Sequence, residues 1–195
     1  MQARTNPERS AATKAQLIAA ARALFVEKGY ADTATPDIVA AAGVTRGALY
    51  HHFADKQALF AAVVEREAAA VADEVEHAAP FSSDAMGMLQ TGGRAYLQAM
   101  RVPGRTRLLL IDGPAALGRA AMDEVHNRHG SRSLREGLAA AMEARAIRTL
   151  PLDALTVQLG AMFDAAILAI EHGGQVEEHM EVLGALMNGL AAPGA

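Results

Sequence analysis

The sequence predicts an all-α fold in two parts, an N-terminal three-helix domain over residues 1–54 and a C-terminal helical domain over residues 55–195, with about nine helices in total. Two observations support this prediction. Alanine, leucine and methionine dominate, while aromatic residues make up only 4% of the 195 residues, and such a composition favours helices over sheets. Glycine and proline also divide the chain into segments of helical length, along which apolar residues recur every three or four positions.

The first helix is expected over residues 12–29, behind a polar segment at residues 1–11 that should form a flexible arm. Gly29 ends this helix, and Lys28 lies in its last turn, where the helix dipole favours a cation. The apolar residues of the helix share one face: Leu17, Ala21, Leu24 and Phe25.

The segment from Thr35 to Lys56 reads as two short helices joined by a glycine-centred turn. Thr35 is expected to cap the first helix, and Gly43 supplies the positive φ that ends it. Thr45 can cap the second helix, which covers residues 45–52. This is the helix-turn-helix pattern, in which the N-terminal residues of the second helix meet base edges in the DNA major groove.

The second short helix has side chains that suit DNA. Arg46 lies at the unfavourable end of the helix dipole, and its donor fork fits guanine or phosphate. Gly47 costs about 1 kcal/mol relative to alanine inside a helix, which makes sense where the backbone must approach another molecule closely. Tyr50, His51 and His52 are consecutive, so at least one of them must be exposed. The alternative for Ala48 and Leu49 is that they simply pack against the protein core.

The run AAGVTRGALYHHFADK, residues 41–56, resembles the DNA-recognition segment of the tetracycline-repressor (TetR) family of bacterial transcription regulators. The resemblance covers roughly residues 12–60, and the rest of the chain is similar to the family in length and helical character. It implies a DNA-binding repressor that small apolar ligands release from a palindromic operator. Family positions that touch DNA are matched by Thr35, Arg46, Gly47, Ala48, Tyr50, His51 and Lys56, and the expected DNA-binding set also includes Thr45 and His52.

A long helix, expected over residues 55–79, should connect the two domains. Asp55 is placed to cap it, and no glycine or proline interrupts it. Apolar residues near both of its ends can enter two different cores, so the helix can act as a lever between them. The other interpretation is a helix that only connects. Resemblance to the family favours the lever.

Further helices are expected over residues 84–101, 105–112, 115–129 and from about 131 to 147, with a serine before residue 84 as a cap. The last two helices, separated by the turn at residues 172–174, look like a pair with broad apolar faces. We expect this pair to meet its copy in a homodimeric four-helix bundle, because one recognition helix alone reads few bases. The alternative is that both apolar faces are buried by packing within one chain.

The C-terminal domain is expected to hold a largely apolar effector between its helices. Asp164, in the middle of an apolar helix, is the stronger polar candidate, whereas Asp112 more simply caps a turn. His126 and His129 have a spacing that could share a ligand, but a metal site is not expected, because no cysteine supports one. The candidate lining residues are Leu89, Tyr96, Met100, Leu109, Met122, His126, Met142, Met162, Phe163 and Asp164.

Composition narrows the classes of function. Residues 1–56 contain 7 Lys and Arg against 5 Asp and Glu, whereas the rest of the chain contains 11 against 17, so a mildly basic part precedes an acidic one. No nucleotide-binding, nucleophile-elbow or zinc-protease motif occurs, and neither an enzyme nor a cofactor is expected. No apolar run is expected to be long enough to span a membrane, and the absence of cysteine suits the cytoplasm. The rival interpretation is a helical small-molecule-binding protein or enzyme that does not act on DNA.

Overall fold

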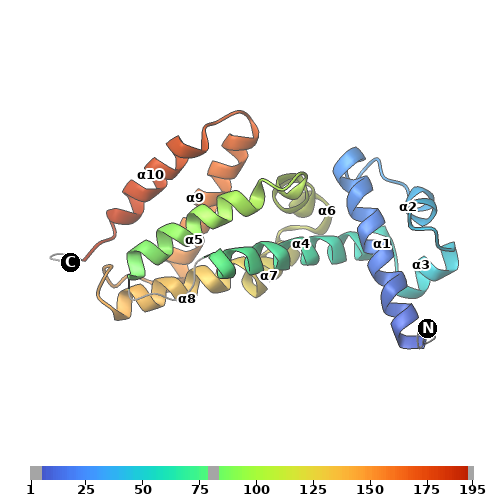
Figure 1. Ribbon diagram of the computed structural model, residues 1–195, viewed down its shortest axis with the longest axis horizontal. Helices are drawn as coiled ribbons and strands as arrows, with labels where there is room; N and C mark the ends of the chain where they lie inside the picture. Colours follow the sequence, from blue (N-terminus) through green and yellow to red (C-terminus); the bar gives the residue numbers. More distant parts are fainter. Residues whose placement is uncertain (1–5, 79–83, 193–195) are drawn as a thin grey trace.

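The computed structural model describes residues 6–78 and 84–192, and within them the chain forms ten α-helices and one π-helical segment. Figure 1 shows α1 to α3 gathered at one end of an elongated molecule, with α4 leading from them into the remaining helices. The elements are α1 (Asn6–Lys28), α2 (Thr35–Ala42), α3 (Arg46–His52), α4 (Lys56–Ala78), α5 (Ala85–Met100), η1 (Arg107–Asp112), α6 (Gly113–Leu117), α7 (Arg119–Arg128), α8 (Gly130–Glu143), α9 (Leu152–Glu171) and α10 (Val176–Asn188). The all-α prediction is confirmed.

The N-terminal helices enclose a small apolar core that the sequence pattern predicted closely. The fully buried residues on α1 to α3 are Leu17, Ala21, Phe25, Ile38 and Leu49. Aromatic rings close this core against α4, since Phe25 meets Phe60 edge-to-face with ring centroids 5.0 Å apart and Tyr30 lies 4.7 Å from Phe60. Burial of these side chains fixes the orientation of α3 relative to α1 and α4.

Two expectations about this end of the molecule were wrong. Residues 6–11 belong to α1 rather than to a flexible arm, because Pro7 stands in the first turn, where its missing N–H costs nothing. Helix α2 has Ala34 as its N-cap, so Thr35 is already its first helical residue and makes no capping hydrogen bond. Other expected features are confirmed: Gly43 ends α2 with φ 63°, and the Thr45 side chain caps α3. Residues 1–5 lie outside the described residues.

Helix α4 belongs to both ends of the molecule. Asp55 caps it as predicted, accepting a hydrogen bond from the Ala58 N–H at 2.7 Å. Near its start Phe60 and Val64 are buried with α1, and near its end Val71 is buried while the helix packs on α5 and α8. A single helix of 23 residues therefore contributes side chains to two apolar cores. Tilting one end of this helix must displace the other end.

The helices between α5 and α8 differ from the prediction in their boundaries. Asp84 caps α5 through the Gly87 N–H at 2.9 Å, and the serines expected to cap it fall outside the described residues. Gly113 has a helical φ of −55°, so Gly113 and Pro114 begin α6 instead of ending a helix, with Pro114 in the first turn. The expected helix over residues 115–129 is interrupted by Gly118, whose φ is 83°. The last expected break, before Leu152, is confirmed.

Helices α9 and α10 follow the predicted pairing but leave apolar surface uncovered. Helix α9 is long and apolar enough to cross a membrane by length and composition, contrary to expectation, with a mean hydropathy of 1.5 over a window of which 28% is buried. It packs against α5, α8 and α10 through Leu159, Phe163 and Ile167. On the outer faces of the pair, Val157 is 64% exposed, Val182 57% and Leu186 50%.

Candidate nucleic-acid interface and domain junction

Helix α3 divides sharply into a buried face and an exposed one. The Thr45 hydroxyl accepts a hydrogen bond from the Ala48 N–H at 3.1 Å, which fixes the first turn. Leu49 is fully buried, whereas Tyr50 is 45% exposed and lies 5.5 Å from the Arg46 guanidinium in a cation–π contact. This contact holds two long side chains together on the outer face, beside the exposed His51.

Gly47 lies exposed in the first turn of α3, and the fold itself has no need of a glycine there. A Cβ added at this position would meet only the Thr45 hydroxyl, at an ordinary distance of 3.9 Å. Its φ is also outside the left-handed region that favours glycine. Neither packing nor backbone conformation within residues 6–78 and 84–192 therefore requires this glycine, which weakens the helix.

The other residues predicted to contact DNA are more enclosed. Thr35 and Ala48 are half-buried. His52 is also half-buried, and its ring lies 5.1 Å from that of His51 and 6.4 Å from that of Phe53. The structure therefore presents Arg46, Gly47, Tyr50 and His51 outward and turns His52 toward the core.

Lys56, predicted to contact DNA, holds a loop in place in this structure. Its Nζ donates to the backbone carbonyls of Tyr30 at 2.8 Å, Thr33 at 3.0 Å and Ala31 at 3.4 Å. It also lies 4.4 Å from the centre of the Tyr30 ring. All three donors of the ammonium group are thus directed at the loop between α1 and α2, and a phosphate would have to displace at least one of these carbonyls.

Among the residues predicted to line an effector pocket, Tyr96 on α5 and Phe163 and Asp164 on α9 lie in direct contact. The Tyr96 hydroxyl donates to Asp164 Oδ1 at 2.8 Å, and the Tyr96 and Phe163 rings meet edge-to-face at 6.3 Å. Burial raises the pKa of Tyr96 well above its ordinary value, and burial also raises the pKa of Asp164, against the lowering effects of the Tyr96 hydrogen bond and nearby His126. Met142 and Met162 are partly buried against the apolar core that runs through the whole molecule. Its buried members from the predicted set are Leu89, Met100, Leu109, Met122 and Phe163.

His126 and His129, considered together in the sequence, face different partners. His126 lies near enough to Asp164 to lower the pKa of that carboxyl group, whereas His129 Nε2 lies 2.7 Å from Glu65 Oε1 on α4. The hydrogen bond from Arg128, assisted by that from His129, lowers the pKa of Glu65 to about 2. This cluster fastens the end of α7 to α4.

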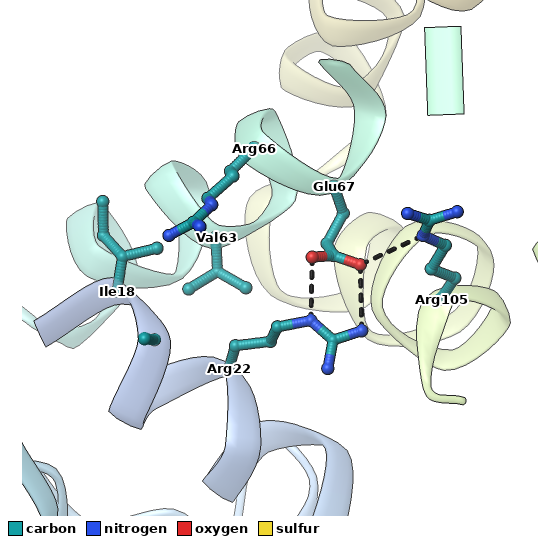
Figure 2. A pocket seen from close by; sticks show the side chains of 7 residues that line it. Ile18, Arg22, Val63, Arg66, Glu67 and Arg105 are labelled. Carbon is teal, nitrogen blue, oxygen red and sulfur yellow. Dashed lines mark hydrogen bonds and ion pairs between the residues drawn. The ribbon is translucent and has the colours of Figure 1, made fainter. Parts of the chain in front are cut away.

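A buried ion-pair network, which sequence reasoning missed, joins α1 to the rest of the molecule (Figure 2). Glu67 on α4 accepts two hydrogen bonds from Arg22 on α1, at 2.8 and 3.1 Å, and one from Arg105 at 3.3 Å. Arg105 also binds Glu74 twice and the Ala99 carbonyl. Only 8% of the Glu67 side chain and 7% of the Arg105 side chain are exposed. One carboxylate therefore ties three segments together.

Further contacts strengthen this domain junction. Asp112 Oδ2 accepts hydrogen bonds from the Tyr30 N–H at 3.1 Å and from Arg107 Nε at 3.2 Å, so it connects η1 to the loop after α1 instead of merely capping a turn. Gln57 on α4 donates to the Ala116 carbonyl of α6 at 2.6 Å. A signal for the network was present in the sequence, since Glu67 falls on the apolar stripe that buries Val64 and Val71. A charged residue on such a stripe needs a partner.

Comparison with known proteins agrees with this geometry. Two family models match: the one for bacterial regulatory proteins of the tetR family, over residues 17–63, and the one for the tetracyclin repressor-like C-terminal domain, over residues 86–190. The chain is 33% identical over 109 residues to the HTH-type transcriptional regulator AcrR of Shigella flexneri, covering 55% of this chain and 51% of AcrR. It is 48% identical over 62 residues to the regulator CymR of Pseudomonas putida, covering 32% of this chain and 30% of CymR. These matches span about half the length of those relatives, or less.

Structural similarity extends over nearly the whole chain. A solved TetR-family transcriptional regulator from Pectobacterium atrosepticum is 32% identical, with a TM-score of 0.77 over 97% of this chain and 99% of that one. The matching family models cover the helix-turn-helix and more than half of the chain beyond it. The helix-turn-helix geometry, the two family models and this full-length relative together show that the chain belongs to the TetR family of bacterial regulatory proteins.

Proposed function

We propose that the protein is a dimeric transcription repressor that binds a palindromic operator in double-stranded DNA and leaves it when a small, largely apolar molecule binds the C-terminal part. The observation that carries the proposal is the outer face of α3. Arg46, Tyr50 and His51 are exposed on it next to Gly47, a position where the packing of the described residues does not require glycine. Donors and aromatic groups around an open stretch of backbone suit a helix that enters the major groove.

The uncovered apolar faces of α9 and α10 support the dimer. Val157, Val182 and Leu186 are each at least half exposed in the single chain, and a contiguous exposed apolar patch commonly marks a protein–protein interface. Pairing α9 and α10 with their copies would bury them in a four-helix bundle. Two recognition helices would then meet half-sites about 34–36 Å apart or somewhat more on the operator.

The effector would act through α4, with the division between domains near residues 54 and 55. The Tyr96–Asp164 pair supplies a polar group inside an otherwise apolar core, as small-molecule sites commonly do. Helix α4 contributes buried side chains to both apolar cores. A ligand that favours one tilt of α4 would therefore change the distance between the two recognition helices. A ligand can shift this equilibrium only by binding one tilt better than the other.

A titration with duplex DNA from the region flanking its own gene, at two salt concentrations, tests the proposed function. Specific binding that weakens steeply with salt is expected, because phosphate contacts release counterions. A helical protein or enzyme that does not act on DNA would show no sequence-specific binding in the same titration.

Arg46→Ala should lower operator affinity and also reduce the preference for the operator over unrelated DNA. A guanidinium that reads a base typically contributes about 1–3 kcal/mol of discrimination. The measurement is the ratio of the two dissociation constants for wild type and variant. An equal loss on both DNAs would assign Arg46 to the phosphate backbone.

Gly47→Ala should stabilise the protein and weaken its binding to DNA at the same time. The added methyl group meets only open space and the Thr45 hydroxyl, and alanine is favoured over glycine in a helix by up to about 1 kcal/mol. On DNA the same methyl group would hold the helix away from the groove. Urea unfolding and operator titration separate the two effects, and a variant that binds the operator as wild type does would show that the backbone does not approach it closely.

A further inference from the structure

A cavity opens at the junction between α1 and α4, away from the residues expected to bind the effector. Its volume is about 280 Å³, slightly below the range typical for drug-sized ligands. Figure 2 shows the side chains around it. The lining consists of Ile18, Ala19, Arg22, Val63, Arg66, Glu67 and Arg105.

Positive charge exceeds negative charge in this lining, with three arginines and one glutamate. Arg22 and Arg105 are both directed at Glu67, which neutralises part of their charge. Arg66 has no hydrogen-bond or ion-pair partner within residues 6–78 and 84–192, and it is exposed. In Figure 2 it extends along α4 over Val63 toward Ile18. The cavity therefore has a free planar donor group at one side.

The remaining wall of the cavity is apolar. Val63 is 1% exposed, Ile18 is half-buried, and Ala19 leaves space where a longer side chain would fill it. A guanidinium beside apolar walls suits an anion that carries a hydrocarbon group, because the carboxylate can take two parallel hydrogen bonds while the hydrocarbon covers the walls. Inorganic phosphate would leave those walls in contact with water.

We propose that this cavity binds a small organic carboxylate, with Arg66 receiving the carboxylate and Ile18 and Val63 contacting its apolar part. The lining comes from α1, from α4 and from the turn after α5. A bound carboxylate would therefore bridge the N-terminal helices to the C-terminal ones, next to the Glu67 network. This site shares no lining residue with the Tyr96–Asp164 pair.

Calorimetric titration of the full-length protein with benzoate, at constant ionic strength, tests the proposal. Saturable binding is expected, and the neutral isostere benzamide should bind at least about tenfold more weakly, since it lacks the charge that the guanidinium pairs with. Arg66→Gln should weaken benzoate binding by a similar factor, and Arg66→Lys should retain part of it. Arg66 is exposed, so both variants should unfold at the wild-type temperature.

Two matched variants on α1 locate the site. Ala19→Leu should abolish benzoate binding by filling the cavity, whereas Ala23→Leu, one turn further along the same exposed side and outside the lining, should leave it unchanged. Absence of saturable binding, equal affinity for benzamide, or wild-type affinity in Arg66→Gln would each overturn the proposal. Loss of benzoate binding in Tyr96→Phe with none in Ala19→Leu would also overturn it, by placing benzoate in the C-terminal core.

Discussion

Val182→Glu should convert the dimer into monomers and lower operator affinity by about two orders of magnitude or more. Val182 is 57% exposed in the single chain, so glutamate there is solvated and the protomer still folds. In the proposed four-helix bundle the same carboxylate would be buried without a partner, at a cost of several kcal/mol. Each monomer would then hold one half-site only, and the gain of about 10²–10⁴ from linking two binding events would be lost. Sedimentation at micromolar concentration and an operator titration measure the two effects.

Ile111→Glu is the matched control for this prediction. Ile111 is 47% exposed, but it lies on η1 and not on α9 or α10. The same substitution there should leave both the dimer and the affinity for DNA unchanged. If Val182→Glu still sediments as a dimer, the interface lies elsewhere on the molecule. If it becomes monomeric but binds the operator as wild type does, the repressor does not act as a dimer.

Local rules were sufficient to predict the N-terminal helices. Gly43 ends α2 with a positive φ and Thr45 caps α3, as backbone geometry and capping chemistry require. The apolar stripe of α1 is buried where its spacing placed it. The differences from the prediction there are also local: Pro7 fits the first turn of a helix, so α1 includes residues 6–11 of the expected arm, and Ala34 rather than Thr35 is the N-cap of α2.

The domain junction could not be predicted in the same way, because its partners are far apart in sequence. Arg22 and Glu67 are separated by 45 residues, and Tyr30 and Asp112 by 82. The sequence shows that Glu67 needs a partner but offers many arginines, and only the packing of α1 against α4 selects Arg22. Lys56 illustrates the same limit, since no pattern in the sequence indicates that its ammonium group meets three carbonyls of one loop.

Glu67→Ala should destabilise the protein by about 3 kcal/mol. Removing one member of a buried ion pair typically costs about 3–5 kcal/mol, because the remaining charge stays buried without compensation. The lower end applies here, since Arg105 keeps Glu74 and the Ala99 carbonyl, and Arg22 is 30% exposed and keeps the Pro103 carbonyl. Urea unfolding of wild type and variant gives the difference in free energy. Glu67→Gln, which keeps the shape and one acceptor oxygen, should cost less.

Glu76→Ala is the matched control for Glu67→Ala. It removes an exposed ion pair of α4 and so shows how much of the cost of Glu67→Ala comes from burial. Glu76 pairs with Arg132 at the surface, with 46% of its side chain exposed, and such pairs contribute about 0–1 kcal/mol. An equal cost for the two variants would show that the Glu67 network adds no more than a surface contact.

Glu67 also fixes α1 to α4, so its loss should let α3 take up more orientations relative to α4 and lower operator affinity even where the protein remains folded. Glu76→Ala keeps that junction intact and should bind the operator as wild type does.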